Sequence, residues 1–162
     1  MASSYDFDRT RGVGSGVERL GWVDRTALGS QDLLLLVARI LIGAIFVQSG
    51  FGKLMNLGGF AGSLGAQGLP APMLLAAIGG AVEFFGGLAV VLGAWTRLAA
   101  AAVIVFTIMA TLIAHRYWAV PPEAAGMQRI QFMKNVAIIG GYFGLIAAGA
   151  GRFSVDGWRL RR

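Results

Sequence analysis

The chain of 162 residues contains no cysteine, a single histidine and few charged residues. Without cysteine it cannot form a disulfide, supply a thiolate nucleophile or ligate an iron–sulfur cluster through sulfur. One histidine, His115, is too few for a haem held by two histidines, and we predict no metal site. Any redox role would need a bound organic cofactor or a partner protein. No covalent cofactor is expected.

Charged residues make up 14% of the chain and hydrophobic residues 56%, whereas soluble domains carry about 25% charged residues. Four apolar runs are each long enough to cross a bilayer, which takes about 20 residues. Together they leave no room for a separate globular domain. The sequence therefore predicts an all-α fold, a bundle of four transmembrane helices. The runs are 33–53, 73–95, 98–117 and 132–151.

The segments outside these runs divide the chain into three parts. Residues 1–32 are predicted to be a polar, flexible N-terminal tail, and they contain no apolar stretch of signal-peptide length. Residues 33–157 would form the membrane domain, and residues 158–162 a basic C-terminal tail.

Lysine and arginine placement predicts the orientation. With four spans, nine basic residues fall on the side of the two termini and four on the other side. Cytoplasmic segments carry the excess of basic residues, so both termini are expected in the cytoplasm. Topology thus explains the net charge of +6. The expected partner is the lipid bilayer, and no nucleic acid is expected.

Two connections carry further predictions. The glycine-rich loop 56–72 is expected to form a short interfacial helix that ends at Pro70 and Pro72. In the second loop, Arg97 lies in a very tight turn, and Asp156 follows the fourth run. We expect a surface contact between Arg97 and Asp156, which would be architectural and contribute little energy.

The first run places two cations on one helical face with two glycines. Arg39, Gly43, Phe46, Gly50 and Lys53 are spaced by four, three, four and three residues, which is one stripe of a helix. Glycines in membrane helices mark close helix contact. The charged face is therefore predicted to point into the bundle.

The second run contains one carboxylate near its middle, Glu83. Gly79 and Gly87 lie four residues before and after it, with Gly80 and Gly86 beside them. The same spacing argument turns Glu83 toward a neighbouring helix. A charge within a membrane span costs from about 3 to more than 10 kcal/mol by different methods, so Glu83 must be paired, protonated or used.

Depth along the helices decides which cation can meet Glu83. At about 1.5 Å per residue, and with the outer helix ends at one level, Arg39 lies within reach of Glu83 whereas Lys53 lies about 15 Å too far out. The sequence therefore predicts an Arg39–Glu83 pair. Three roles stay open: a structural ion pair, contact with a ligand or a moving proton, and a protonated Glu83.

A second polar cluster is predicted at the outer ends of the helices. It contains Lys53, His115, Trp118, Lys134 and Asn135 as candidate ligand-binding or catalytic residues. Histidine is the side chain that titrates near neutral pH. Each residue also has a structural alternative. The lysines would extend to the headgroups, and Trp118 would belong to the interfacial aromatic belt. The histidine would be a structural hydrogen-bonding residue.

These residues, in this order, resemble the DoxX family of small four-helix bacterial membrane proteins. The resemblance covers residues 35–157 and rests on several ordered pieces. They are Arg39-x3-Gly43-x6-Gly50-x2-Lys53, Leu69-Pro70, Glu83-x2-Gly86-Gly87-x5-Gly93-x2-Thr96-Arg97, His115-x2-Trp118, Lys134-Asn135, Gly140-Gly141 and Gly149-x-Gly151-x2-Ser154-x-Asp156. The chain has Ser154-Val155-Asp156 where the family often has Ser-Leu-Asp.

The resemblance implies a bacterial inner-membrane protein linked to thiosulfate, quinone or thiol-stress systems. Arg39, Glu83 and His115 would then be candidate catalytic residues, and Lys53 would help to line a polar pocket for a quinone headgroup or a small anion. If the chain takes part in catalysis, it would do so as a subunit of a quinone-linked oxidoreductase, with a redox partner subunit or a second copy. The alternatives are a non-enzymatic assembly or anchoring subunit and, ranked last, a small transporter.

Overall fold

The computed structural model describes residues 21–162, which form seven helices and no strand. Four of these helices are long and apolar enough to cross a membrane, namely α3, α5, α6 and α7. The predicted all-α fold with four transmembrane helices is therefore confirmed. In chain order the helices are α2 (Trp22–Gly29), α3 (Gln31–Met55), α4 (Leu57–Ala66), α5 (Pro72–Leu92), α6 (Thr96–Ala114), α7 (Pro122–Ala148) and α8 (Val155–Arg159).

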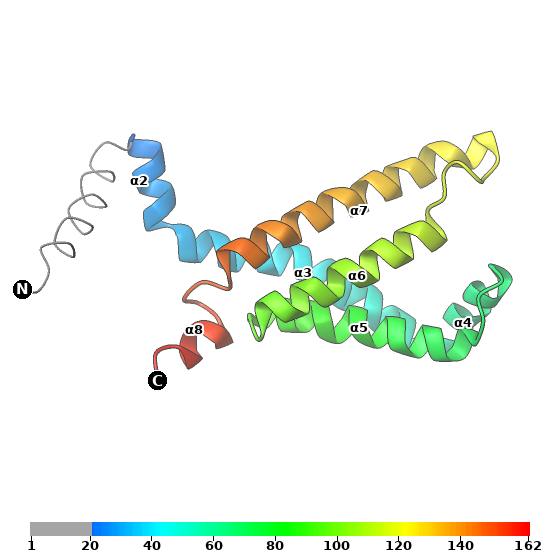
Figure 1. Ribbon diagram of the computed structural model, residues 1–162, viewed down its shortest axis with the longest axis horizontal. Helices are drawn as coiled ribbons and strands as arrows, with labels where there is room; N and C mark the ends of the chain where they lie inside the picture. Colours follow the sequence, from blue (N-terminus) through cyan, green and yellow to red (C-terminus); the bar gives the residue numbers. More distant parts are fainter. Residues whose placement is uncertain (1–20) are drawn as a thin grey trace, which may run out of the picture.

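The four long helices run along the length of the molecule (Figure 1). The short helices α2 and α8 lie at one end, which we call the α8 end, together with the C-terminus. Helix α4 and the connection between α6 and α7 lie at the opposite end, the α4 end. This arrangement separates two groups of polar residues by the length of the bundle.

The boundaries of the four long helices lie within three residues of the predicted ones except at the start of α7. The predicted short helix in the loop 56–72 is present as α4, with Pro72 starting α5. Helix α7 begins at Pro122 instead of at residue 132, because proline suits the first helical turn even though the residues that follow are polar. In the predicted N-terminal tail, α2 is helical with no buried residue, and residues 1–20 lie outside the described range.

Helices α3 and α5 pack through glycines that allow their backbones to approach closely. A Cβ atom on Gly50 would lie 2.4 Å from the backbone nitrogen of Phe84, and one on Gly87 would lie 3.0 Å from that of Val47. Glycine is therefore required at this contact, as predicted for membrane helices. Gly79 lies against Phe106 of α6, whereas Gly80 lies against α3.

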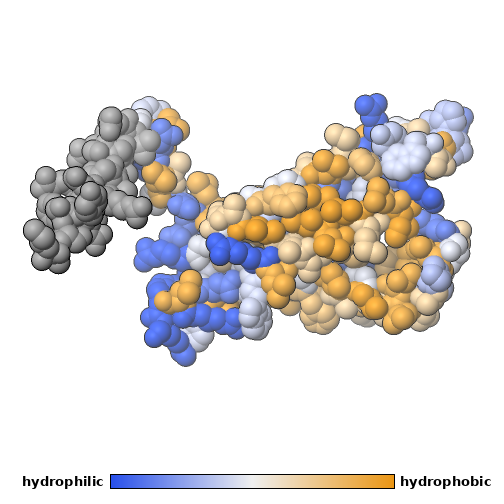
Figure 2. Space-filling model, viewed as in Figure 1, coloured by the Kyte–Doolittle hydropathy of each residue, from blue (hydrophilic) through white to orange (hydrophobic). Residues whose placement is uncertain are grey.

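The interior is small, and the outer surface is apolar. Phe46 and Tyr142 meet edge to face in the core with ring centroids 5.6 Å apart. Large side chains such as Leu41 and Phe85 are more than 60% exposed. In Figure 2 hydrophobic residues cover the middle of the molecule, and hydrophilic residues gather toward its ends. Such a surface suits lipid chains between two headgroup layers.

Candidate functional site

The carboxylate of Glu83 is buried in the bundle and paired with Lys53. Glu83 lies on α5 with its side chain 6% exposed, and its Oε2 is 2.5 Å from Lys53 Nζ. Lys53, near the end of α3, is 28% exposed, and its ammonium also lies 5.1 Å from the ring centroid of Phe60 and 5.5 Å from that of Phe106. The pair therefore has one nearly dry partner and one that is partly accessible.

The predicted Arg39–Glu83 pair is wrong. The error lies in the assumption that α3 and α5 end at the same level. Gly80 of α5 lies against Lys53 and Leu54 at the end of α3, so α5 extends outward beyond α3 by the segment from Gly80 back to Pro72. Helix α4 covers that extension, with its Ala61 and Leu64 packed against Ala76 of α5. The offset between α3 and α5 places Lys53 at the depth of Glu83.

Arg39 instead binds backbone carbonyls at the α8 end. It is fully buried. Its Nη1 donates to Val91 O at 3.2 Å and its Nη2 to Phe153 O at 2.5 Å. Val91 lies in the last turn of α5, where carbonyls lack helical partners and the helix dipole favours a cation. The prediction that Arg39 points inward is confirmed, but its contacts are with the end of α5 and with the connection between α7 and α8.

The Lys53–Glu83 pair borders a cavity of about 180 Å³ among the four long helices. Three more candidates from the sequence line it: His115 at the end of α6, and Lys134 and Asn135 on α7. The structure thus brings together five of the predicted site residues.

Neighbours that the sequence did not reveal hold the polar side chains of this cavity. His115 Nδ1 lies 2.9 Å from Gln128 Oε1, and Asn135 Nδ2 donates to Thr111 Oγ1 at 2.8 Å. Lys134 Nζ donates to Gln131 Oε1. Gln128 escaped notice because the fourth span was expected to begin after it. The signal available in the sequence was the position of Gln128, three residues before Gln131 and six before Lys134, which is a helical spacing.

Trp118 lies outside the cavity. It is 57% exposed and contacts Tyr117 and Phe132, with centroid distances of 5.0 and 5.9 Å. This arrangement matches the alternative of an interfacial aromatic residue. Within residues 21–162 no group of three or more histidine, aspartate or glutamate side chains could hold a metal ion.

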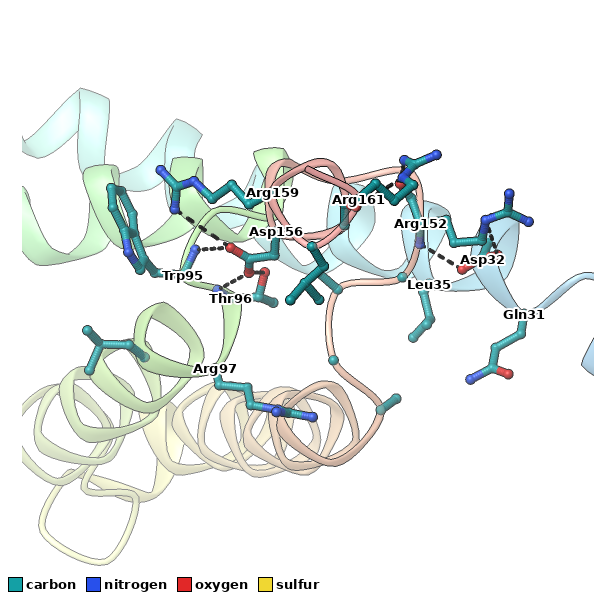
Figure 3. A pocket seen from close by; sticks show the side chains of 17 residues that line it. Gln31, Asp32, Leu35, Trp95, Thr96, Arg97, Arg152, Asp156, Arg159 and Arg161 are labelled. Atoms are coloured by element: carbon teal, nitrogen blue, oxygen red, sulfur yellow. Dashed lines mark hydrogen bonds and ion pairs between the residues drawn. The ribbon is translucent and has the colours of Figure 1, made fainter.

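At the α8 end, Asp156 caps the start of α6. Its carboxylate accepts hydrogen bonds of 2.8 Å from Trp95 N, Thr96 N and Thr96 Oγ1 (Figure 3). The predicted Arg97–Asp156 contact is wrong, because Arg97 Nε donates to Ile146 O at 3.0 Å instead. Burial opposes ionisation of Asp156, but the hydrogen bonds from Thr96 and Trp95 and the nearby Arg159 charge lower its pKa.

The cap also fixes a strained turn. Trp95 has a φ of +44°, a left-handed conformation that costs a residue with a side chain about 1–2 kcal/mol. The hydrogen bonds that Asp156 accepts from Trp95 N and Thr96 N therefore stabilise both the start of α6 and the unfavourable backbone conformation of Trp95. The acceptor comes from a segment far along the chain, which is why the tight turn alone did not reveal it.

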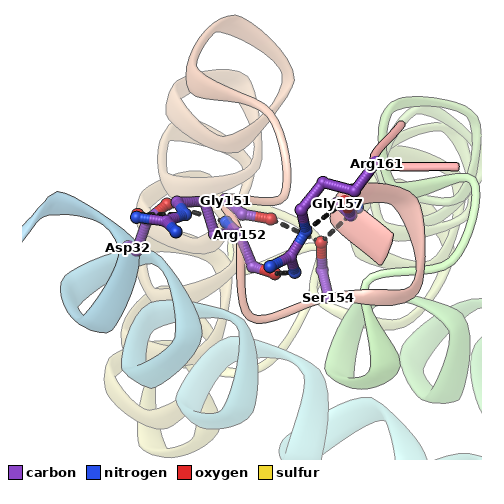
Figure 4. A network of polar contacts seen from close by, with 6 residues as sticks. All are labelled: Asp32, Gly151, Arg152, Ser154, Gly157 and Arg161. Carbon is purple, nitrogen blue, oxygen red and sulfur yellow. Dashed lines mark hydrogen bonds and ion pairs between the residues drawn. The ribbon is translucent and has the colours of Figure 1, made fainter. Parts of the chain in front are cut away.

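The segment between α7 and α8 is folded by its own hydrogen bonds (Figure 4). Ser154 Oγ accepts from Gly157 N at 2.9 Å and caps α8, and Arg161 Nη2 donates to Arg152 O at 2.8 Å. Arg152 N donates to Asp32 Oδ1 at 2.7 Å, which joins the segment to the start of α3. The spaced glycine, serine and aspartate residues of the sequence therefore serve to build this connection.

Comparison with known proteins agrees with this architecture. The DoxX family model matches residues 34–116. The chain is 37% identical over 127 residues to inner membrane protein YphA of Escherichia coli strain K12, covering 78% of this chain and 91% of the relative. Inner membrane protein YqjF of the same organism is 36% identical over 126 residues, covering 78% and 92%. No solved structure matches the chain. This four-helix membrane protein belongs to the DoxX family.

Proposed function

We propose that the protein binds the headgroup of a membrane quinone and acts as a subunit of a membrane redox or stress-response system. The observation that carries the proposal is the cavity that joins the Lys53–Glu83 pair to His115, Lys134 and Asn135. Ionisable groups within a membrane span are costly to keep and commonly mark sites of function. Here Lys53, Glu83 and Lys134 line a cavity, whereas Arg39 does not.

The residues around the cavity fit a quinone headgroup in size and chemistry. Sites for drug-sized ligands measure about 300–1,000 Å³, so a cavity of about 180 Å³ suits a single ring. Phe46 and Phe106 supply apolar walls. Lys53, His115 and Asn135 carry N–H groups that can donate to carbonyl oxygens. An isoprenoid tail would lie outside the cavity, among the lipid chains.

When bound, a quinone supplies the redox chemistry, since its reduction to a quinol takes up electrons together with protons. In the proposed site Lys53 Nζ donates to a carbonyl oxygen, where preorganised donors stabilise developing negative charge. Glu83 Oε2 orients that ammonium through the 2.5 Å contact. His115 holds and exchanges a proton at a ring nitrogen, while Gln128 fixes the orientation of the ring.

We assign the electron donor to a partner subunit, following the redox systems that the family resemblance suggests. We also propose that both termini face the cytoplasm, which places the α4 end on the periplasmic side of an inner membrane. The excess of basic residues on the side of the termini supports this orientation.

Quinone binding by the purified protein tests the proposal. The full-length protein is purified in mild detergent, its lipid extract is assayed for quinone by liquid chromatography, and a short-chain quinone is titrated by calorimetry. We expect the double variant Lys53→Gln/Glu83→Gln, which keeps the net charge, to bind about tenfold more weakly. The control Glu123→Gln/Arg129→Gln removes one acid and one base from exposed positions of α7 and should bind normally. A wild-type protein that neither retains nor binds quinone would sink the proposal.

A structural subunit without a ligand is the second candidate, and the contacts of Arg39 favour it. Arg39 is a buried charge whose hydrogen bonds go to backbone carbonyls that join helix ends, so one intramembrane charge already holds the bundle together. If Lys53 and Glu83 have the same role, their double glutamine variant will keep full cellular function at normal protein levels. Under the quinone proposal the same variant loses function at normal levels.

A further inference from the structure

A second and larger cavity lies at the α8 end, far from the proposed quinone site. It measures about 870 Å³ and is formed by the starts of α3 and α6, the end of α7, and α8 (Figure 3). This volume falls within the range of about 300–1,000 Å³ that is usual for ligand sites. The residues of the Lys53–Glu83 cavity are absent from its lining.

The lining of this cavity is rich in arginine. It contains four arginines and two aspartates, so positive charge is in excess. These residues are Arg97, Arg152, Arg159, Arg161, Asp32 and Asp156.

Both aspartates of the lining are already engaged by the backbone. Asp156 accepts from the N–H groups of Trp95 and Thr96, and Asp32 accepts from that of Arg152. The two carboxylates therefore neutralise the arginines only in part. The ion pairs that remain are long, at 3.9 Å from Arg152 to Asp32 and 4.0 Å from Arg159 to Asp156.

Two of these arginines have donors to spare. Among residues 21–162, Arg97 makes one hydrogen bond, from Nε to Ile146 O, which leaves its terminal nitrogens for a ligand. Arg159 stacks on the ring of Trp95, with its guanidinium carbon 4.2 Å from the centroid. Stacking orients the planar guanidinium and leaves its edge available for oxygen acceptors. Guanidinium groups bind phosphate oxygens in bidentate fashion.

The apolar rim of the cavity indicates that its ligand has a hydrophobic part. Trp95 is 63% exposed, Leu98 72% and Leu160 89%, and all three line the cavity. The cavity also lies at the helix ends, where the hydrophobic surface of the bundle gives way to a hydrophilic one (Figure 2). A lipid headgroup occupies that level in a bilayer, and its acyl chains continue along the apolar surface.

We propose that this cavity is a binding site for an anionic phospholipid, to which Arg97 and Arg159 contribute positive charge from different sides of the cavity. The arginine excess complements the charge of the headgroup, and the exposed Trp95 and Leu98 complement the upper part of the acyl chains. Basic clusters beside transmembrane helices bind anionic lipids by this combination of charge and depth. The site is independent of the quinone proposal, because it lies at the other end of the bundle.

Lipid titration of the purified protein tests the site. The delipidated full-length protein in neutral detergent is titrated with phosphatidylglycerol, with phosphatidylcholine and with inorganic phosphate, and binding is followed by native mass spectrometry. We expect phosphatidylglycerol to bind about tenfold more tightly than phosphatidylcholine. Arg97→Gln and Arg159→Gln should each weaken phosphatidylglycerol about fivefold, the effect of one basic residue near the membrane surface.

Arg129→Gln is the matched control, because it removes the same charge from an exposed position of α7 near its opposite end. It should leave binding unchanged, and an equal loss in this variant would overturn the proposal by assigning the effect to net charge. Equal affinity for the two lipids would also overturn it. So would binding of inorganic phosphate with the same dependence on Arg97, since that result indicates a site for a free anion. If Arg97→Gln lowers protein stability, the lipid affinity of Arg159→Gln alone tests the proposal.

Discussion

Removing either charge of the Lys53–Glu83 pair should destabilise the bundle, but by different amounts. Lys53→Gln leaves a carboxylate that is 6% exposed without its partner, and breaking a buried pair in this way costs about 3–5 kcal/mol. Glu83→Gln leaves an ammonium that is 28% exposed on a long stem that can turn toward the headgroups. We expect this second variant to lose about 1.5–3 kcal/mol, the range for a hydrogen bond to a charged group.

A double-mutant cycle separates this pair from the Arg39–Glu83 pair that the sequence predicted. The double variant Lys53→Gln/Glu83→Gln should cost less than the sum of the single variants, by about 1–3 kcal/mol. The costs of Arg39→Gln and Glu83→Gln should instead add to within about 0.5 kcal/mol. Arg39 is bonded to the carbonyls of Val91 and Phe153 and shares no partner with Glu83.

The assay is reversible unfolding in mixed micelles, in which the fraction of sodium dodecyl sulfate is raised and helicity is followed by circular dichroism. Each variant gives a free energy of unfolding, and the cycle compares four such values. Strong coupling between Arg39 and Glu83, together with additive costs for Lys53 and Glu83, would refute the assignment of Lys53 as the partner.

Two further predictions concern the helix cap and the glycine contact. The pKa of Asp156 is lowered from its ordinary value of 3.8, so its contribution to stability is complete above that value and is lost as the pH falls through the lowered pKa. Asp156→Asn should therefore reduce stability at neutral pH by about 1 kcal/mol and weaken the loss of stability at acid pH. Thermal unfolding from neutral pH to about pH 3 measures both effects. A variant that loses stability at acid pH as the wild type does would contradict the prediction. Gly50→Ala places a methyl group against the backbone of Phe84 and should cost about 1–3 kcal/mol. Gly52→Ala, whose added Cβ meets nothing within 4 Å, should be neutral or slightly stabilising, and equal losses in the two alanine variants would contradict close packing at Gly50.

Residue spacing predicted which side chains face inward. Arg39 and Glu83 are both buried, because helical periodicity fixes the face that a residue occupies regardless of its neighbours. Lys53, His115 and Asn135 could also be grouped correctly, since each lies toward the same end of the bundle in an antiparallel arrangement of spans. Facing direction and end of the bundle are thus properties that the sequence carries by itself.

The offset of α3 and α5 along the bundle axis could not be predicted from the sequence. It depends on the glycine contacts between α3 and α5 and on α4 covering the outer end of α5, and both are tertiary properties. The partners of Arg39 were also missed because they are backbone carbonyls, which every residue carries and which leave no trace in side-chain identity. For the same reason nothing in the turn beside Arg97 revealed that Asp156 caps it.

The contacts of Arg39 have a consequence for how the protein is made. Arg39 lies in α3, yet its acceptors come later in the chain, Val91 at the end of α5 and Phe153 after α7. Asp156 likewise reaches Trp95 and Thr96 only after all four spans have been translated. In a nascent chain α3 therefore enters the membrane with a cation whose hydrogen bonds are not yet complete. Closure of the bundle is a late, post-insertion event that any polypeptide released before residue 153 would fail to complete.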